Sequence, residues 1–283
     1  MSTTINSSLD YPKQVTIETV AICNAHCDFC PHEKLARRGA VMEMRLIEKV
    51  VSELVQFPAD FPLEIALNGV NEPLADKRLF DILDIISHAL PNAKIYFVTN
   101  GNLLDEKVIA TLSKYNLSKL CISLNFYDRE TYKKRMGLEW DKTLAAINIL
   151  HAKTLSGEFT HPVHISRVQD RSEADSFFTR WVEKNYPAFK PWLKKAGDWL
   201  GAIPRFRCEN GNAMNRCHQW KTMHIASNGI VQHCCMDALI QFPWGDVKHK
   251  NLIEIYNQKE WHALREGEKN RFEIQPCSRC TYY

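Results

Sequence analysis

Along the first two thirds of the chain, short β-branched runs alternate with longer segments whose apolar residues recur every three or four positions. The first run, Gln14–Val20, alternates in the manner of a strand. Further strands are predicted at Leu63–Leu67, Lys94–Val98, Lys119–Leu124 and Val163–Val168, with a less clear sixth at Lys190–Lys195. Helices are predicted at Glu43–Phe57, Asp76–Leu90, Asp105–Tyr115, Arg129–Arg135, Asp141–Ala152 and Ser172–Tyr186. Such regular alternation indicates parallel strands joined by crossover helices, hence an α/β fold.

The alternation stops at about Gly197, and the remainder of the chain has a different pattern. Two short β-like runs, Lys221–Ala226 and Ile230–Cys235, flank Asn228 and Gly229, and an Asn-Gly pair in this setting predicts a hairpin. We therefore expect two domains, an α/β domain over residues 1–200 and a smaller one over residues 201–283.

Composition limits the class of protein. A chain of 283 residues is long enough for one barrel-sized domain and a small appendage. Its ten cysteines are tightly clustered, which favours metal ligation in a reducing compartment over disulfide bonds. We expect a cytoplasmic protein with no membrane partner, because there is neither a secretory signal nor an apolar run of spanning length. The net charge of +3 argues against a nucleic-acid partner.

Three cysteines, Cys23, Cys27 and Cys30, fall within eight residues directly after the first predicted strand. Three soft thiolates at one point of a loop are typical of an iron–sulfur cluster. Three ligands are one too few for four irons, so one iron would keep an open position, as catalytic metal sites do. The alternative is a zinc site completed by His26 or His32.

The spacing of these cysteines, with Phe29 before the last of them, resembles the signature of the radical S-adenosylmethionine (AdoMet) enzymes. In that family AdoMet chelates the open iron, and an electron from the cluster splits the sulfonium to give a 5′-deoxyadenosyl radical. The resemblance implies a partial (β/α)6 TIM-like barrel, a 4Fe-4S cluster, AdoMet, and an electron donor of the flavodoxin or ferredoxin type.

Loops after the predicted strands extend the resemblance, because chemistry in parallel α/β folds gathers at the carboxyl ends of strands. The stretch from Asn68 to Pro73 resembles the family's glycine-rich motif, although Asn71 stands where glycine is common. Asparagine tolerates the positive φ that this position would need. By resemblance, the cofactor contacts are Phe29, Gly69, Asn71, Glu72, Thr99, Asn100, Ser123, Asn125, Ser166 and Arg167.

Each of these contacts has a plainer interpretation. Thr99-Asn100-Gly101 by itself is a turn sequence. Ser123 could satisfy the backbone at a strand end, and Arg167 could be a surface charge. Their joint occurrence in the expected order favours AdoMet binding.

The carboxy-terminal part contains further cysteines. Cys217, Gly229 and Cys234 have spacings similar to the opening of SPASM domains and of their shortened twitch form. The stretch Asp246–Asn257 resembles the connecting helix of those domains. The resemblance implies a small cysteine-rich twitch-type domain with an auxiliary 4Fe-4S cluster. Its expected ligands are Cys217, Cys234, Cys277 and Cys280.

Two points about these cysteines stay open. Cys235 competes with Cys234 as a ligand, because neighbouring strand residues face opposite ways. Four cysteines could also bind structural zinc. Cys121, within a strand, is expected to be a buried hydrophobe. Cys208 and Cys235 are candidate catalytic thiols that return a hydrogen atom to a carbon radical.

The layout is most similar to the group that contains the butirosin-type aminocyclitol dehydrogenase and the neomycin-type epimerase. We therefore expect oxidation or epimerisation of a small hydroxylated metabolite. The alternatives are a maturase of ribosomally made peptides, disfavoured because the sequence has no extra amino-terminal domain, and a non-catalytic zinc or cluster-binding protein. Basic residues outnumber acidic ones between Lys190 and Lys221, which favours an anionic substrate or is simply a solvated face.

Overall fold

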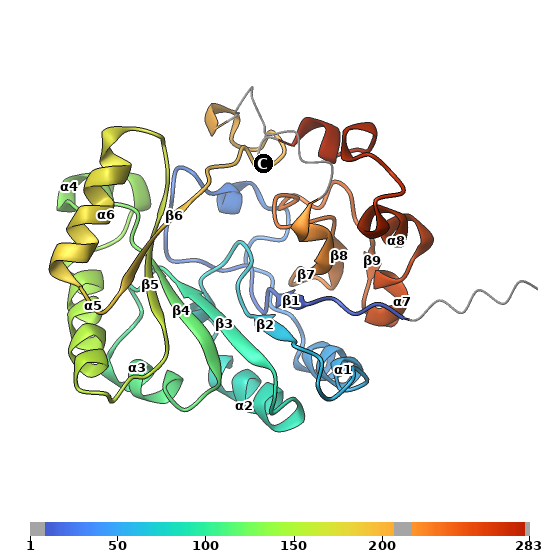
Figure 1. Cartoon of the computed structure of the whole chain (residues 1–283), viewed down its shortest axis with the longest axis horizontal. Coiled ribbons are helices and arrows are strands. Elements are labelled where there is room, and N and C mark those ends of the chain that lie inside the picture. Colours follow the sequence, from blue (N-terminus) through green and yellow to red (C-terminus); the bar gives the residue numbers. More distant parts are fainter. Residues whose placement is uncertain (1–8, 207–216, 281–283) are drawn as a thin grey trace, which may run out of the picture.

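A curved sheet of parallel strands forms the centre of the molecule (Figure 1). The structure is a computed structural model that describes residues 9–206 and 217–280. The barrel strands are β1 (Gln14–Ile17), β2 (Glu64–Ala66), β3 (Lys94–Thr99), β4 (Leu117–Ser123), β5 (Val163–Val168) and β6 (Lys190–Lys194). Each pairs in parallel with the next in sequence, so the order β1 to β6 is unbroken. This confirms the predicted partial six-unit barrel, including its less clear sixth strand.

Helices follow the strands and cover the outer face of the sheet (Figure 1). They are α1 (Met44–Leu54), α2 (Leu79–Ala89), α3 (Glu106–Leu112), α4 (Arg129–Met136), α5 (Trp140–Leu155) and α6 (Glu173–Asn185). Strand residues such as Ile65, Phe97 and Ile165 are fully buried against them. Cys121 is also fully buried, as predicted. The apolar periodicity therefore identified the helical faces that pack on the sheet.

The hairpin that was predicted after Gly197 continues the barrel sheet. Strand β7 (Thr222–Ile225) pairs in parallel with β1, and β8 (Ile230–Gln232) and β9 (Gly245–Asp246) follow in antiparallel pairs. Gly229 occupies the turn with a φ of +86°. The carboxy-terminal segment thus begins as part of the same nine-stranded sheet.

Helices α7 (Leu252–Tyr256) and α8 (Lys259–Glu266) pack beside this extension. Trp261 of α8 is fully buried, and its ring is stacked on that of Trp244. The expected connecting helix is shorter than predicted, because Asp246 belongs to β9. Six 3-10 helices complete the described structure: η1 (Pro31–Lys34), η2 (Pro73–Ala75), η3 (Pro204–Phe206), η4 (His218–Lys221), η5 (Arg271–Glu273) and η6 (Cys277–Arg279). None of the helices in the described ranges has both the length and the apolarity of a membrane span.

Candidate active site

Cys23, Cys27 and Cys30 lie together on the loop that follows β1. Burial raises the pKa of Cys23 to about 11 and that of Cys30 to about 12. Burial also raises the pKa of Cys27 well above its ordinary value, and the charges of the other two thiols raise it further. With these raised pKa values the three thiols are protonated at neutral pH in the metal-free protein. Metal coordination would deprotonate them to thiolates. The donor set fits an iron–sulfur cluster held by three cysteines.

The carboxy-terminal end of α4 holds this loop in place. The backbone N–H groups of His26 and Asp28 donate to the carbonyls of Met136 and Arg135, at 2.8 and 3.0 Å. Arg135 also pairs with the Asp28 carboxylate at 2.9 Å. The loop is therefore attached to the barrel wall independently of any metal.

The histidines of the zinc alternative have other neighbours. His26 is exposed, and its Nδ1 lies 2.8 Å from the Glu33 carboxylate. His32 is buried, and its Nε2 lies 3.2 Å from the Ala21 carbonyl. Among the described residues, the His32 Nδ1 has no hydrogen-bond partner.

Glu72 connects the ends of β2 and β3. Its carboxylate is almost fully buried and accepts hydrogen bonds from the Thr99 hydroxyl and the Asn100 backbone N–H, both at 2.7 Å. Burial raises the pKa of Glu72 to about 7, although these hydrogen bonds act in the opposite direction. The Asn100 amide donates to the Asn24 side chain at 2.8 Å. The structure thus brings Glu72, Thr99 and Asn100 beside the first cysteine loop.

Gly69 and Asn71 shape the loop before Glu72. A Cβ atom at Gly69 would lie 2.7 Å from a carboxylate oxygen of Glu18, so this position needs glycine. Asn71 does not adopt a positive φ, and the expectation that it would was wrong. Its side-chain oxygen instead accepts a hydrogen bond from the Gly69 N–H at 2.6 Å, and its amide donates to the Leu67 carbonyl. Hydrogen bonds of the Asn71 side chain therefore shape this loop, in place of the positive φ that a glycine would adopt.

Asn125 has a left-handed backbone, with a φ of +63°, between the ends of β4 and β5. Its amide nitrogen donates to the Ser123 hydroxyl at 3.0 Å, and its oxygen accepts from the Val168 N–H at 2.9 Å. Ser166 is fully buried beside it. These hydrogen bonds bring Ser123, Asn125 and Ser166 to one point at the strand ends.

Arg167 is only 2% exposed, so its interpretation as a surface charge is wrong. Its guanidinium donates to Asp175 at 2.8 Å, to Asp170 at 2.8 Å and to the Asn125 carbonyl at 2.6 Å. These partners hold the Asn125 loop against α6. A direct contact with AdoMet stays a prediction.

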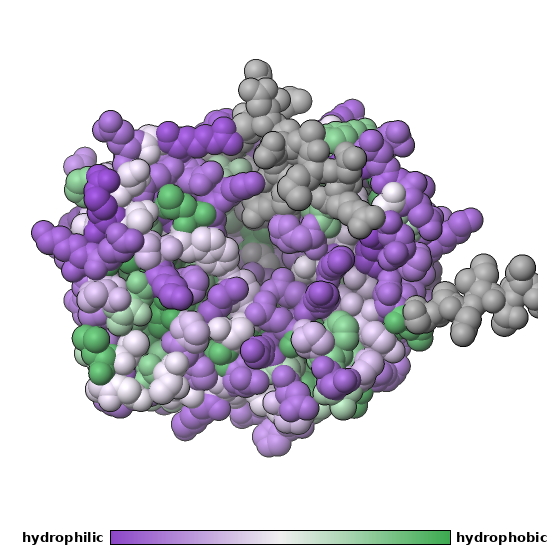
Figure 2. All heavy atoms as spheres, in the orientation of Figure 1, coloured by the Kyte–Doolittle hydropathy of each residue, from purple (hydrophilic) through white to green (hydrophobic). Residues whose placement is uncertain are grey.

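A segment after β6 covers the first cysteine loop and was not foreseen. The Trp199 indole N–H donates to the Phe29 carbonyl at 3.0 Å, and Lys34 donates to the Ala202 carbonyl at 2.6 Å. Trp199, Leu200 and Gly201 have φ angles of +52°, +53° and +93°. Only Gly201 carries a sequence signal for such a conformation, which bulky residues rarely adopt. Figure 2 shows a hollow near the centre of this face, between β6 and the β7–β8 hairpin.

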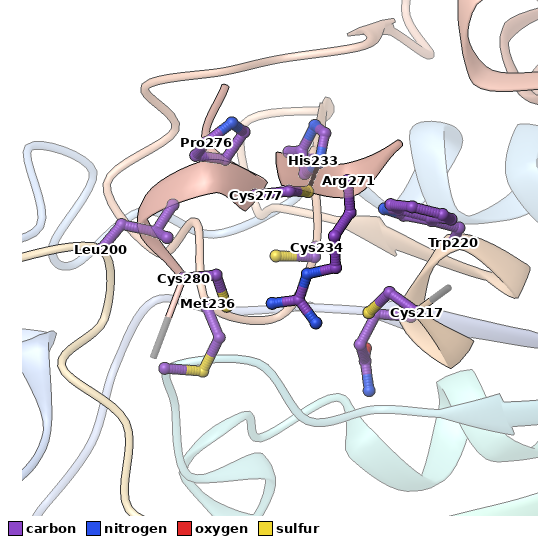
Figure 3. Close-up of a pocket in the computed structure, with 11 residues that line it drawn as sticks. Leu200, Cys217, Trp220, His233, Cys234, Met236, Arg271, Pro276, Cys277 and Cys280 are labelled. Carbon is purple, nitrogen blue, oxygen red and sulfur yellow. Dashed lines mark hydrogen bonds between the residues drawn. The ribbon is translucent and has the colours of Figure 1, made fainter. Parts of the chain in front are cut away.

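The four cysteines predicted for the second site line one pocket (Figure 3). These are Cys217, Cys234, Cys277 and Cys280. Trp220, His233 and Arg271 line the same pocket. The His233 Nε2 lies 3.2 Å from the Cys277 sulfur. Burial raises the pKa of Cys277 to about 11, and the nearby Arg271 charge opposes that rise. Four converging thiols fit a fully cysteine-ligated iron–sulfur cluster.

Cys234 and Cys235 both lie in the bend after β8, because the strand ends at Gln232. Strand alternation therefore does not decide between them. Cys234 lines the pocket, whereas Cys235 is not among its lining residues. Burial raises the pKa of Cys235 to about 12, and the nearby Cys217 and Cys280 raise it further. The assignment of Cys234 as the ligand stays a prediction. Cys208 falls outside the described residues.

A buried ion pair links the two sites and was missed in the sequence. Glu18 accepts hydrogen bonds from Arg37 at 2.6 and 2.9 Å, from the Ser227 hydroxyl at 3.0 Å and from the Val70 N–H at 3.1 Å. Arg37 also donates to the Ala238 carbonyl at 2.6 Å. Burial acts to raise the pKa of Glu18, but these partners together hold it below its ordinary value.

Comparison with known families decides what this architecture belongs to. The profile of the Radical SAM superfamily matches residues 17–172, more than half of the chain. The chain belongs to the radical SAM superfamily. A second profile, the iron–sulfur cluster-binding domain SPASM, matches residues 217–281. This radical SAM enzyme therefore uses AdoMet, a 4Fe-4S cluster and an auxiliary cluster, and the zinc alternatives are set aside.

Two curated relatives match this radical SAM enzyme over part of its length. An S-adenosyl-L-methionine-dependent 2-deoxy-scyllo-inosamine dehydrogenase from Niallia circulans is 26% identical over 110 residues, 38% of this chain and 43% of that protein. An AdoMet-dependent heme synthase from Methanosarcina barkeri is 24% identical over 141 residues, 49% of this chain and 39% of that protein. The matched regions thus span less than half of either relative.

Solved structures share the fold over nearly the whole chain. BtrN in complex with AdoMet and 2-DOIA has a TM-score of 0.69 at 16% identity, covering 96% of this chain and 94% of BtrN. Streptococcus suis SuiB bound to the precursor peptide SuiA has a TM-score of 0.67 at 15% identity, covering 96% of this chain and 70% of SuiB. The fold of this radical SAM enzyme is therefore common to proteins with different bound molecules.

Proposed function

We propose that this radical SAM enzyme abstracts a hydrogen atom from an unactivated C–H bond of a small hydroxylated metabolite and completes an oxidation or an epimerisation. The observation that carries the proposal is the assembly of two separate cysteine sites on one continuous sheet. When bound, the first cluster and AdoMet supply the hydrogen-abstracting radical, and the auxiliary cluster supplies an electron acceptor.

The chain's own residues hold and orient these groups. We assign Cys23, Cys27 and Cys30 to the first cluster. The second cluster is assigned to Cys217, Cys234, Cys277 and Cys280. The cofactor contacts assigned to the barrel are Phe29, Gly69, Asn71, Glu72, Thr99, Asn100, Ser123, Asn125, Ser166 and Arg167. Their support is that the structure brings most of them to the loops at the carboxyl ends of β2 to β5, beside the first cysteine loop. The boundary near residue 200 separates the two functional parts.

The dehydrogenase relative supports a small polar substrate, because a hydroxylated ring compound is named for it. Cys235 lies beside the second site and is our candidate for the thiol that returns a hydrogen atom in an epimerisation. Cys208 is the other candidate.

Anaerobic reconstitution tests the enzyme assignment. Two 4Fe-4S clusters predict about eight irons and about eight sulfides per chain. Reduction in the presence of AdoMet should then release 5′-deoxyadenosine. Zinc alone, with no cleavage of AdoMet, would contradict the proposal and favour a non-catalytic metal-binding protein.

Reaction in deuterated water separates oxidation from epimerisation. Deuterium in a recovered product indicates hydrogen return from an exchangeable thiol, and its loss in Cys235→Ala or Cys208→Ala identifies the donor. An unlabelled oxidised product indicates a dehydrogenase.

A peptide substrate is the second candidate, and the likeness to SuiB bound to its precursor peptide favours it. Modification of a peptide, with no turnover of hydroxylated small molecules, would replace the metabolite in the proposal. Either reaction needs a one-electron donor, for which we propose a flavodoxin or a ferredoxin.

A further inference from the structure

The face of the barrel sheet that points away from the helices carries basic side chains. On β4, Leu120 and Ile122 are fully buried in the core beneath the helices. Because strand residues alternate, Lys119 and Ser123 occupy the opposite, inner face. Ser123 is one of our cofactor contacts, so Lys119 lies on the same face as the cofactor site but deeper in the barrel.

Strand pairing places more residues on this inner face. Tyr96 pairs directly with Lys119, and Trp192 pairs with Ser166, another of our cofactor contacts. Lys194 comes two positions after Trp192 and shares its face. The inner face therefore combines cofactor contacts at its upper end with lysines and aromatic rings below and beside them.

These side chains lie close together in space. The Lys119 ammonium lies 4.4 Å from the centroid of the Tyr96 ring and 5.6 Å from that of Trp192. The Lys194 ammonium lies 5.0 Å from the Trp192 centroid, and the His164 ring lies 5.9 Å from it. We refer to Tyr96, Lys119, His164, Trp192 and Lys194 as the inner basic cluster. All five are partly exposed.

The cluster is positively charged, and among the described residues no carboxylate forms an ion pair with it. Burial lowers the pKa of His164, and the charges of Lys119, Lys190 and Lys194 lower it further. Across the described residues, none of these three lysines forms an ion pair with Asp or Glu. Like charges held together in partial burial cost free energy, and an anion removes that cost.

We propose that the inner basic cluster binds an anionic group of the substrate, a phosphate or a carboxylate, and so holds the substrate against the inner face beside the cofactor site. This inference rests on the proposed function. Lysine provides a compact charge with three donors, which suits either anion. The cation–π contacts hold Lys119 and Lys194 over aromatic rings, whereas lysines of a solvated face extend into water.

Isothermal titration calorimetry on the reconstituted, anaerobic protein tests this inference with two probes, inorganic phosphate and malonate. We expect wild type to bind one of them, phosphate if the group is phosphoryl and malonate if it is a carboxylate. Lys119→Met and Lys194→Met should each weaken binding about tenfold or more, because a charged hydrogen bond is lost. The double variant should lose binding, and arginine at both positions should retain it.

The matched control is Lys142→Met with Lys184→Met, which removes two exposed lysines from α5 and α6. It should bind the probe as wild type does. Failure of wild type to bind either anion, full binding by the double variant, or equal loss in the control would overturn the inference. Cleavage of AdoMet by wild type is measured separately. Cleavage without anion binding rejects the basic cluster alone, and anion binding without cleavage rejects the proposed function instead.

Discussion

The cysteines of both sites are partly or fully buried, but the charged side chains beside them differ in sign. At the amino-terminal site, carboxylates add to the effect of burial and raise the thiol pKa values further, Glu72 for Cys23 and Glu18 for Cys30. At the carboxy-terminal site the guanidinium of Arg271 opposes the effect of burial on Cys277. Figure 3 shows Arg271 reaching into the space that the cysteines surround.

This difference has a redox meaning. A negative charge near a redox group disfavours an added electron and lowers its reduction potential, whereas a positive charge raises it. We therefore expect the Arg271 charge to favour electron acceptance at the second site, whereas at the first site Arg37 neutralises most of the Glu18 charge. A positive charge beside the auxiliary cluster would help it to accept the electron that a substrate radical releases on oxidation.

Removing one cysteine site at a time tests whether the two sites have separate roles, and it should have the largest effect. Cys27→Ala should reduce bound iron from about eight to about four per chain and abolish formation of 5′-deoxyadenosine. Cys280→Ala should cause a similar loss of iron but retain cleavage of AdoMet. Iron analysis and product chromatography measure both. Cys121→Ala is the control, since this buried thiol is in neither site, and it should keep both clusters.

The link between the sites is the next target. Glu18→Gln leaves the buried Arg37 guanidinium without its counter-charge, and we expect a loss of about 3–5 kcal/mol in the free energy of unfolding. Denaturant unfolding measures it. The double variant Glu18→Gln with Arg37→Met should recover part of the loss. A Glu18→Gln protein as stable as wild type would show that the pair does not hold the two sites together.

Glu72 provides a pH-dependent test of the amino-terminal site. Its pKa of about 7 lies above the ordinary 4.5, so the folded chain keeps this proton longer than the unfolded chain does. The resulting stability is fully present below pH 4.5 and is lost as the pH rises through 7. The free energy of unfolding of the metal-free chain, measured by denaturant between pH 5 and pH 8, should fall less steeply with pH in Glu72→Gln than in wild type. The exposed Glu48→Gln should follow wild type.

Replacing Arg271 should change the reduction potential of the auxiliary cluster, and this is the smallest effect that we expect. Arg271→Gln removes the cation beside the second site, and we expect the potential of the auxiliary cluster to fall by on the order of 50 mV. Arg271→Lys should retain most of the potential. A titration followed by electron paramagnetic resonance measures it. An unchanged potential in Arg271→Gln would mean that this charge does not set the polarity between the sites.

Local patterns in the sequence were sufficient for the strands and helices of an α/β fold, and the family resemblance supplied the partial barrel. Apolar periodicity and β-branched runs placed the strands and helices to within a few residues, since both report burial of a nearby face. The convergence of the first cysteine set was predictable from its short spacing, whereas that of the second set, which spans residues 217–280, rested on the family resemblance.

Long-range contacts were not predictable in the same way. Nothing local indicates that β7 pairs with β1, that Glu18 meets Arg37 and Ser227, or that Arg271 enters the second pocket. Parallel pairing and buried ion pairs depend on residues far apart in sequence. The choice between Cys234 and Cys235 stayed open for another reason, because the strand ends at Gln232, before the rule of alternation could apply.

The pairing of β7 with β1 also determines what the protein would become if it were shortened. A chain ending near residue 200 would expose the backbone donors and acceptors of β1 along an open edge, a template for sheet growth between molecules. We therefore expect such a fragment to aggregate. Strand β7, which leads into the second cysteine site, thus also shields the edge of the barrel sheet from pairing with other copies of the chain.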